Sequence, residues 1–435
     1  MSAKPLVPGD GVPDRRERFR RFMKRFNPAA SASSAIAEGL IVEAPSRSLY
    51  KRIAIRADLE PGSQQLLVGG IGSGKTTELM LAAVWLAKQG KSSPLFIDVS
   101  QQTDLSKLNS GALLASLGLA TSARLKVLAS KFGQPPPGAP PPIHADVKGA
   151  QEKIKEFAYG KTYQEWIPGP DPDEWDDDYD PGDDLEPEDY TDGYYRTVKI
   201  PARLSPPFPP LDRDIRAALE PLRVLIDAIR DLKVDPIVIF DGLDRLMDVH
   251  KFGPVAIQDL RGIRKLGIPV VASAPLSLFY GEGRQILDLF DKTHYLPPAL
   301  ADTAQDPFLM NVIERRGGSE FLGPDETKEL CLGSGGVLRD LIALARNAGE
   351  EAYIEGSENI GLEHMRKAVL QLGQSYFLGL GHPQISALLK LRNEGAFSSA
   401  DAAHLDLLLS RRVLERPPDR YELHPALAPL LTDGN

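Results

Sequence analysis

Residues 64–80 read QQLLVGGIGSGKTTELM and decide how the rest of the chain is arranged. The stretch opens with an apolar run that predicts a short buried strand over 66–68. A glycine-rich loop follows, and residues with good helix propensity begin at Lys75. A strand, a glycine-rich loop and a helix in this order predict one unit of an α/β fold.

The loop and the first helical residues match the pattern G-x-x-x-x-G-K-[ST], which binds nucleotide phosphates. Glycines let the backbone N–H groups point inward around a phosphate, and the helix adds its free N–H groups and its positive dipole end. Lys75 is predicted to bind the β- and γ-phosphates of ATP, and Thr76 to ligate Mg²⁺. The predicted nucleotide-binding residues are Gly69, Gly70, Ile71, Gly72, Ser73, Gly74, Lys75, Thr76 and Thr77.

A second acidic element, residues 236–244, reads PIVIFDGLD. Its apolar run predicts a strand buried on both faces of a parallel sheet, with Asp241 at the carboxyl end, where ligands bind in open α/β sheets. Asp241 is predicted to hold the Mg²⁺, and Asp244 to polarise the water that attacks the γ-phosphate. The alternative for Asp241 is a turn at the strand end, where Asp-Gly is common.

Length and composition favour a soluble globular protein with two or three domains. The chain has 435 residues, of which 42% are hydrophobic and 26% are charged. Its single cysteine, Cys331, excludes an intrachain disulfide and favours a cytoplasmic location, and packing rather than chemistry is expected of it. No apolar run is long enough for a transmembrane helix, and the N-terminus lacks the apolar segment of a secretory signal.

The net charge of −9 is unevenly distributed along the chain. Residues 171–192 hold 13 Asp or Glu and no Lys or Arg, so the rest of the chain is slightly basic. Overall acidity therefore does not exclude a phosphate-rich partner such as nucleic acid. The acidic run belongs to a proline-rich insertion at about 133–210, which is expected to be mostly irregular. It is either a solvated spacer or an acidic lid that competes with an anionic ligand for a basic surface.

Residues 1–39 form a basic N-terminal segment and linker. Within it, residues 14–26 predict an amphipathic helix that carries seven Lys or Arg. Its apolar face consists of Phe19, Phe22, Met23 and Phe26. Such a helix can bind a partner groove, an anionic membrane or nucleic acid, and the alternative is that the Phe residues pack on the protein's own domain.

Strands and helices alternate through residues 40–298, apart from the insertion, and predict a P-loop ATPase domain with a parallel sheet covered by helices on both faces. The five strands are expected at 66–68, 95–99, 237–240, 268–273 and 294–296. A helix at 109–131 is expected to break at Gly111 and Gly118, and one at 212–232 to kink or restart at Pro221.

The remaining residues predict two further domains. Residues 299–374 are expected to form a helical lid, in which a glycine-rich stretch places Arg339 in the first turn of a helix. Residues 375–435 contain two predicted helices, a β-hairpin and a final helix at 425–431, which is the pattern of a winged helix.

This order of elements resembles the AAA+ and STAND groups of P-loop ATPases, over about 40–132 and 211–435. The most specific part is the loop at 69–76, and the sequence DGLD at 241–244 is similar to the acidic motif of STAND proteins. The resemblance implies that Ser273 is a polar sensor and that Arg339 is the lid arginine. The alternative for Arg339 is an arginine on the helix surface. The predicted catalytic residues are Lys75, Asp244, Ser273 and Arg339, and the candidates for an arginine finger are Arg261, Arg264 and Arg284.

Two departures from these groups matter for function. AAA+ hydrolases usually place Glu directly after the metal-binding Asp, and this chain has Gly242 there. Hydrolysis is therefore expected to be slow or to use Asp244. STAND proteins also commonly carry a sensor or effector domain. None is visible in this sequence, so a separate protein partner is expected.

The sequence predicts an ATP-binding, Mg²⁺-dependent and slowly hydrolysing switch that self-associates and regulates a separate effector, and the resemblance implies bacterial stress or antiviral signalling. The alternative is a DNA-binding AAA+ loader or transposition-type regulator, in which the winged helix and residues 15–25 contact phosphate. The predicted recognition helix, 399–411, is rich in leucine and basic only at its end, which favours a protein-contacting winged helix. A small-molecule kinase fits less well, because such enzymes rarely carry a lid and a winged helix.

Overall fold

A parallel five-stranded sheet carries the glycine-rich loop. The structure is a computed structural model that describes residues 14–44, 47–131, 145–167, 194–200, 212–246, 252–253, 255–280, 283–302, 304–416 and 420–431. The strand order is β2-β5-β6-β1-β7, and all pairs are parallel. The strands are β1 (Gln64–Val68), β2 (Ser92–Asp98), β5 (Asp235–Asp241), β6 (Val270–Ala274) and β7 (Lys292–Tyr295). Each overlaps a predicted strand, and the predicted fold class is confirmed.

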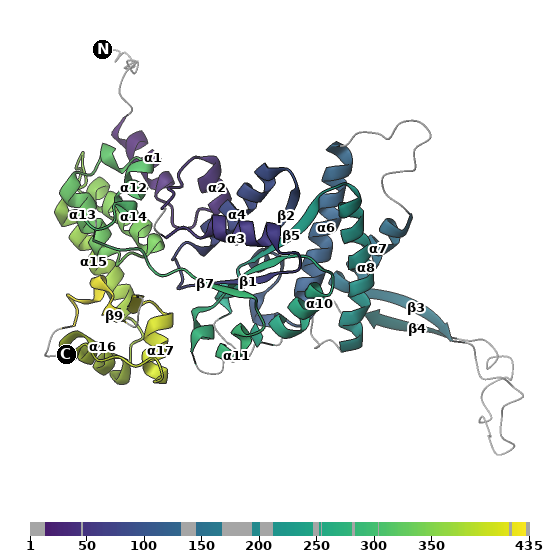
Figure 1. Ribbon diagram of the computed structural model, residues 1–435. Helices are drawn as coiled ribbons and strands as arrows, with labels where there is room; N and C mark the ends of the chain where they lie inside the picture. The colour runs from purple at the N-terminus through teal and green to yellow at the C-terminus, as the bar shows by residue number, and fades with distance from the viewer. Residues whose placement is uncertain are drawn as a thin grey trace, which may run out of the picture.

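Helices cover both faces of this sheet (Figure 1). The two faces have separate cores because successive side chains of a strand point to opposite sides. Leu67 of β1 packs with α3 (Tyr50–Leu59) and α4 (Lys75–Gln89). Its neighbour Leu66 packs in the core formed with α6 (Ala112–Lys131) and α8 (Asp212–Asp231).

The helix α6 runs without a break through Gly118, so the predicted break there is wrong. The adjacent helix α7 (Ala145–Tyr159) packs against both α6 and α8. A Cβ atom at Gly118 would lie 2.5 Å from Cγ2 of Ile154 in α7. Gly118 therefore lets the two helices approach closely. Gly111, with φ of +95°, lies just before α6 begins, as predicted.

The predicted insertion is more regular than expected. After α7 it contains an antiparallel hairpin, β3 (Lys161–Ile167) with β4 (Tyr194–Ile200), which extends away from the sheet in Figure 1. The proline-rich run at 135–142 and the acidic run at 171–192 lie outside the described residues. The predicted restart at Pro221 is also wrong, because α8 continues through this proline as one helix.

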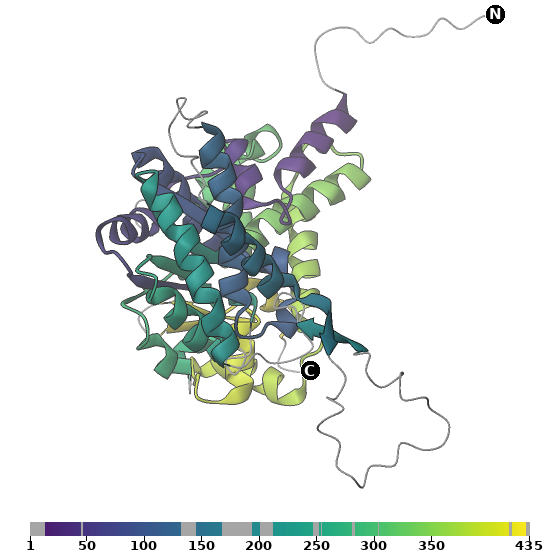
Figure 2. The same ribbon diagram turned by 90° about the vertical axis from the view of Figure 1, so that its right-hand side faces the viewer.

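A helical region, residues 308–377, follows the sheet domain and includes the N-terminal helix in its core. Its helices are α12 (Phe308–Arg315), α13 (Pro324–Gly333), α14 (Leu338–Ile354) and α15 (Leu362–Phe377). The N-terminal helix α1 (Arg15–Arg25) lies beside α14 (Figure 2). It buries Phe19, Phe22 and the adjoining Phe26 in this core. A short helix, α2 (Ala32–Ala37), connects α1 to the sheet domain.

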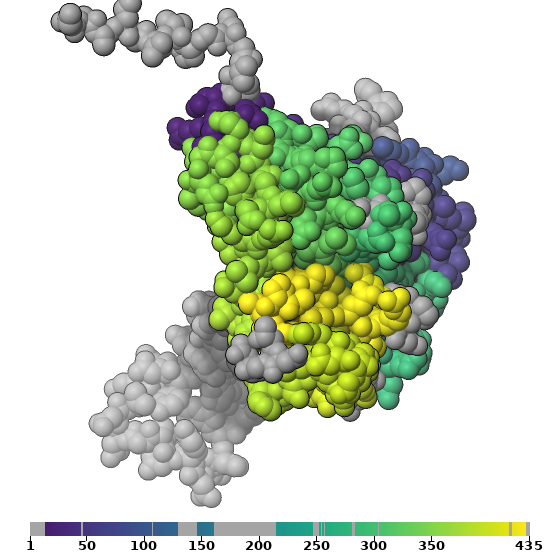
Figure 3. Space-filling model, turned by 90° about the vertical axis from the view of Figure 1, so that its left-hand side faces the viewer, coloured from purple at the N-terminus to yellow at the C-terminus, as the bar shows by residue number. Residues whose placement is uncertain are grey.

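The C-terminal unit, residues 382–431, consists of two helices and a hairpin. They are α16 (His382–Glu394), α17 (Ala402–Leu409), β8 (Val413–Arg416) and β9 (Arg420–Leu423). The predicted final helix is wrong, because residues 425–427 form only a 3₁₀ turn. Figure 3 shows this unit, in yellow tones, packed below the green helical region. Within the described ranges, no helix is both long and apolar enough to cross a membrane.

Candidate nucleotide site

The loop between β1 and α4 has the backbone geometry that its glycines allow. Gly72 has φ of +80° and Gly74 has φ of +104°, in the left-handed region that favours glycine. A Cβ atom at Gly69 would lie 2.5 Å from the carbonyl oxygen of Leu296, so this position also requires glycine. The loop therefore folds back tightly on the end of β7 before α4 begins.

Lys75 joins this loop to the loop that follows β5. Its side chain is only 4% exposed. The Lys75 Nζ donates to the carbonyl oxygens of Gly69 and Gly70 at 2.8 and 2.9 Å, and lies 2.9 Å from Oδ2 of Asp244. The structure thus brings together two of the predicted catalytic residues. A phosphate in the loop and the Asp244 carboxylate are alternative partners for the same ammonium group.

Asp241 lies at the carboxyl end of β5 in a position that fits a metal ligand. It is 3% exposed, and its Oδ1 is buried without a hydrogen-bond partner among the described residues. Burial, followed by the negative charge of Asp244, raises the pKa of Asp241, while a hydrogen bond from Thr76 acts in the opposite direction. A buried, unsatisfied carboxylate oxygen beside the Thr76 hydroxyl suits Mg²⁺, which takes its other ligands from phosphate and water.

The backbone at Gly242 does not accommodate a larger residue directly after Asp241. Its φ is +85°, and a Cβ atom there would lie 2.9 Å from Oδ1 of Asp98 and 3.2 Å from Cβ of Ser100. Asp98 ends β2 directly opposite Asp241, and its Oδ1 accepts hydrogen bonds from the N–H and hydroxyl of Ser100. A glutamate at 242 would be strained and would meet a second carboxylate. Sequence reasoning missed Asp98, although an acidic residue at the end of a neighbouring strand is a usable signal.

Ser273 is completely buried near the end of β6. Its Oγ accepts a hydrogen bond of 3.2 Å from the N–H of Leu243. Ser273 therefore holds the loop that contains Asp241 and Asp244. Its predicted role as a polar sensor stays a prediction.

Arg339 lies beside the phosphate-binding loop. A Cβ atom at Gly72 would lie 2.9 Å from Cβ of Arg339 and 3.0 Å from Cγ1 of Val337, and one at Gly74 would lie 3.1 Å from Cδ1 of Leu338. The start of α14 thus packs on the loop, while the Arg339 side chain is exposed. Glycines at 72 and 74 are needed for close approach as well as for their dihedral angles.

Arg411 of the C-terminal unit also reaches the loop, and sequence reasoning missed it. Its Nη1 lies 2.8 Å from Oδ1 of Asp340 in α14. The same atom would lie 3.4 Å from a Cβ atom added at Gly72. Its backbone has φ of +66°, which is uncommon for a residue other than glycine. Residues at special backbone conformations cluster at functional sites. No local sequence pattern marks an arginine that tertiary packing brings to a distant loop.

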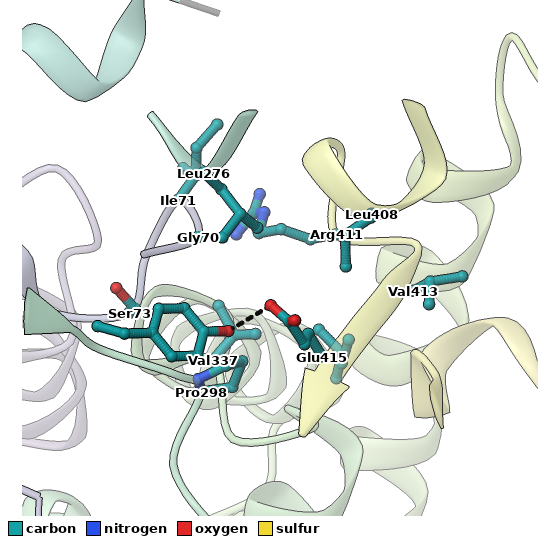
Figure 4. A pocket seen from close by; sticks show the side chains of 12 residues that line it. Gly70, Ile71, Ser73, Leu276, Pro298, Val337, Leu408, Arg411, Val413 and Glu415 are labelled. Carbon is teal, nitrogen blue, oxygen red and sulfur yellow. Dashed lines mark hydrogen bonds between the residues drawn. The ribbon is translucent and has the colours of Figure 1, made fainter. Parts of the chain in front are cut away.

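A cavity lies between the phosphate-binding loop and the C-terminal unit (Figure 4). Gly70 and Ile71 line one side, and Leu408 and Val413 line the other, with the Arg411 side chain extending toward the loop. The dashed line in Figure 4 marks the hydrogen bond of 2.7 Å from the Tyr295 hydroxyl to Oε2 of Glu415. The sheet domain and the C-terminal unit therefore meet directly at the candidate nucleotide site.

The other candidates have ordinary surroundings. Arg264 forms an ion pair of 2.9 Å with Asp291 in the same chain, whereas Arg261 and Arg284 are exposed and have no ion-pair partner among the described residues. Cys331 is buried in the core of the helical region, and burial raises the pKa of its thiol to about 12. It packs and does not face the site.

Comparisons with known proteins find similar structures at low identity. No protein-family model and no curated protein match the sequence. A Cdc6p from Pyrobaculum aerophilum is 12% identical, with 98% of this chain and 94% of that chain covered and a TM-score of 0.37. A Drosophila ORC bound to DNA is 12% identical, with 96% and 85% covered and a TM-score of 0.43.

A RuvB from Thermotoga maritima is 15% identical, with 51% of this chain and 84% of that chain covered and a TM-score of 0.28. At such identities and TM-scores, these similarities carry no conclusion about ligands or activity. We therefore assign a function from the geometry of the site. Its parts are the glycine-rich loop, the acidic residues and the two arginines beside Gly72.

Proposed function

We propose that this chain is an AAA+/STAND-type ATPase that acts as a nucleotide-dependent switch on a separate protein partner. The observation that carries the proposal is the meeting of three parts of the chain at Gly72. The phosphate-binding loop is contacted there by Arg339 from the helical region and by Arg411 from the C-terminal unit. Occupation of the loop would therefore act on both parts at once.

The residues around the loop support ATP binding and hydrolysis. Lys75 is the buried cation that would bind the β- and γ-phosphates, with the loop N–H groups completing the cradle. Thr76 and Asp241 would hold Mg²⁺, which neutralises phosphate charge when bound. Asp244 would orient the attacking water once phosphate has taken its place on Lys75. Because Gly242 leaves no adjoining glutamate, turnover is expected to be slow.

A buried polar network supports the coupling of the loop to the C-terminal unit. Asp340, 4% exposed, lies one residue after Arg339 and binds Arg411 through Oδ1. Its Oδ2 accepts a hydrogen bond of 2.5 Å from the Tyr376 hydroxyl and lies 3.4 Å from Nε2 of His424. Burial alone would raise the pKa of Asp340, but the contact with His424 and the charge of Arg411 hold it below its usual range. Breaking such a buried pair is costly, so the two parts are expected to move together.

Two arginines support a defined hinge between the sheet domain and the helical region. The linker at 296–299 follows β7. Arg47 donates from Nη2 to the carbonyl oxygens of Ser73, in the loop, and Pro297, in the linker, at 3.0 and 2.9 Å. Arg416 donates to the carbonyl oxygens of Ala299 and Gly335 at 2.8 and 2.7 Å. The linker is thus tied to the loop on one side and to the C-terminal hairpin on the other.

Self-association and a separate protein partner belong to the same proposal. Arg261 and Arg284 are exposed, which leaves them available to the nucleotide of a neighbouring copy. The leucine-rich surface of α17 packs partly within the chain, and its Leu407 and Leu408 are buried. This composition favours protein contact over reading of DNA bases by this helix.

Arg339→Ala is expected to bind ATP but to lose the ATP-dependent change in shape or mass. One charged contact that forms only in the ATP state supplies on the order of 2 kcal/mol, which is a roughly thirtyfold shift of the equilibrium. A ligand shifts an equilibrium only by its differential affinity for the two states. Light scattering and small-angle scattering with a slowly hydrolysed ATP analogue measure the change.

Arg366→Ala is the matched control, because Arg366 is an exposed arginine of the same helical region and lies on α15. It should keep the wild-type response. A wild-type chain with the same mass and scattering curve in every nucleotide state would contradict the switch. Loss of ATP binding in Arg339→Ala would instead make Arg339 part of the binding site alone.

A further inference from the structure

The N-terminal helix α1 has its apolar face fully occupied. Phe19, Phe22 and the adjoining Phe26 are at most 3% exposed, and their rings pack on Phe321 and on one another. Arg15 on the flank donates to the carbonyl oxygens of Ala352, Tyr353 and Ser357 at the end of α14. The helix is therefore fixed on the helical region, and its outward face is fixed with it.

That outward face is basic. The exposed basic residues of α1 are Arg16, Arg20, Arg21, Lys24 and Arg25, of which Arg25 lies against Gly317 at the flank of this face. The remaining arginine, Arg18, turns toward the helical region and pairs with Glu320 and Glu358 at 3.0 and 3.1 Å. Among the described residues, the five have only one ion-pair partner, Glu38, which lies 3.7 Å from Lys24. We call these five residues the basic face of α1.

The basic face contains like-charged neighbours that repel one another in the isolated chain. Arg16 and Arg20, Arg20 and Lys24, and Arg21 and Arg25 are three like-charged pairs at i, i+4, each of which costs about 0.2–0.5 kcal/mol in an exposed helix. Arg15 and Arg16 also lie in the first turn, where the helix dipole disfavours cations, whereas Lys24 and Arg25 lie in the last turn, where it favours them. The buried Phe residues hold the helix in place despite this repulsion. An anionic partner would relieve it.

We propose that the basic face of α1 binds the phosphate backbone of nucleic acid. A membrane is disfavoured because a surface-bound helix must insert its apolar face, and the apolar face of α1 is already buried against α14 and Phe321. A helix of 11 residues is about 16 Å long, which matches several successive phosphates of one strand. An extended polyanion can follow the row Arg16, Arg20 and Lys24, whose members lie about one turn apart along one side of α1, whereas a short acidic peptide satisfies only part of this row.

The chemistry of the face predicts binding without sequence preference. Its exposed residues are arginine and lysine, with Glu17 as the one acidic residue between them, and no exposed amide or aromatic side chain of α1 is available to read a base edge. The arginines and lysine thus position a backbone and specify no base. This surface lies at the outer end of the helical region, away from the C-terminal unit (Figure 3).

The test is the salt dependence of DNA binding by the full chain, measured by fluorescence anisotropy with duplexes of about 25 base pairs and without nucleotide. The variant is Arg16→Gln, Arg20→Gln and Lys24→Gln together. Losing three phosphate contacts should lower the slope of log K against log salt by about 2.7 and weaken binding at least about tenfold near 50 mM salt. Two unrelated duplex sequences should bind wild type equally.

The control variant combines Lys88→Gln, Lys126→Gln and Lys153→Gln, which removes the same charge from exposed residues of the sheet domain. It should keep the wild-type slope and affinity. A basic-face variant that binds like wild type, or a wild-type chain that binds anionic vesicles or polyglutamate but not DNA, would overturn the proposal. Lys75→Ala should still bind DNA, so failure of the ATP switch and failure of this surface give different results.

Discussion

Lys75→Ala is expected to weaken ATP binding roughly 150-fold or more. The Lys75 ammonium is 4% exposed and makes short contacts within the phosphate-binding loop. Replacing it removes two charge-assisted hydrogen bonds to phosphate, each worth about 1.5–3 kcal/mol, and about 3 kcal/mol in total corresponds to that loss of affinity. Calorimetric titration with Mg²⁺ and ATP measures the effect directly.

Two further variants separate this effect from loss of folding. Lys88→Ala removes an exposed lysine from the last turn of the same helix, α4, and should bind like wild type. Lys75→Ala leaves Asp244 without its ion pair, so Lys75→Ala combined with Asp244→Asn should recover thermal stability but not ATP affinity. Wild-type ATP affinity in Lys75→Ala would show that this loop does not bind the phosphates of ATP through Lys75.

Asp241→Asn is expected to keep ATP binding and to lose Mg²⁺-dependent hydrolysis at least about a hundredfold. A neutral amide is a poorer Mg²⁺ ligand than a carboxylate, and metal ions supply several kcal/mol of transition-state stabilisation. Binding through Lys75 and the loop N–H groups does not depend on this residue. Phosphate release with and without Mg²⁺, beside a binding titration, checks both parts.

The same variant has a predicted effect on stability. Burial and the charge of Asp244 raise the pKa of Asp241 above the value of the unfolded chain. The ionised carboxylate therefore lowers the free energy of unfolding. This destabilisation is absent at low pH and grows as the pH rises above the unfolded pKa of about 3.9. Asp241→Asn should melt no lower than wild type at neutral pH without nucleotide. A clearly lower melting temperature would mean that Asp241 holds the fold rather than a metal.

Local sequence patterns were sufficient to predict the sheet and the centre of the site. The apolar runs at 66–68 and 237–240 predict buried strands, because parallel strands are covered on both faces. The order of strand, glycine-rich loop and helix then fixes where Lys75 and Thr76 must lie. The resemblance to lid-containing ATPases placed Arg339 beside the loop, which agrees with its contact at Gly72.

Contacts between distant segments were not predictable in the same way. Arg411, Arg47 and Asp98 reach the site only because whole domains or neighbouring strands pack there. Gly118 looks like a helix breaker in the sequence, and only the presence of Ile154 shows that it permits close packing. The amphipathic pattern of α1 fits an external partner as well as internal packing, and burial of its Phe residues decides the question for that face.

We expect nucleotide in the loop to move the C-terminal unit, and a fluorescence distance measurement can detect this movement. Lys88→Cys in α4 and Lys390→Cys in α16 place dyes on exposed sites of the two parts, and the native Cys331 is buried. Adding Mg²⁺ and a slowly hydrolysed ATP analogue should change the energy-transfer efficiency with the same Kd as nucleotide binding, and the change should be absent in Lys75→Ala. If the energy-transfer efficiency stays constant while the site is saturated with nucleotide, the nucleotide does not move the C-terminal unit.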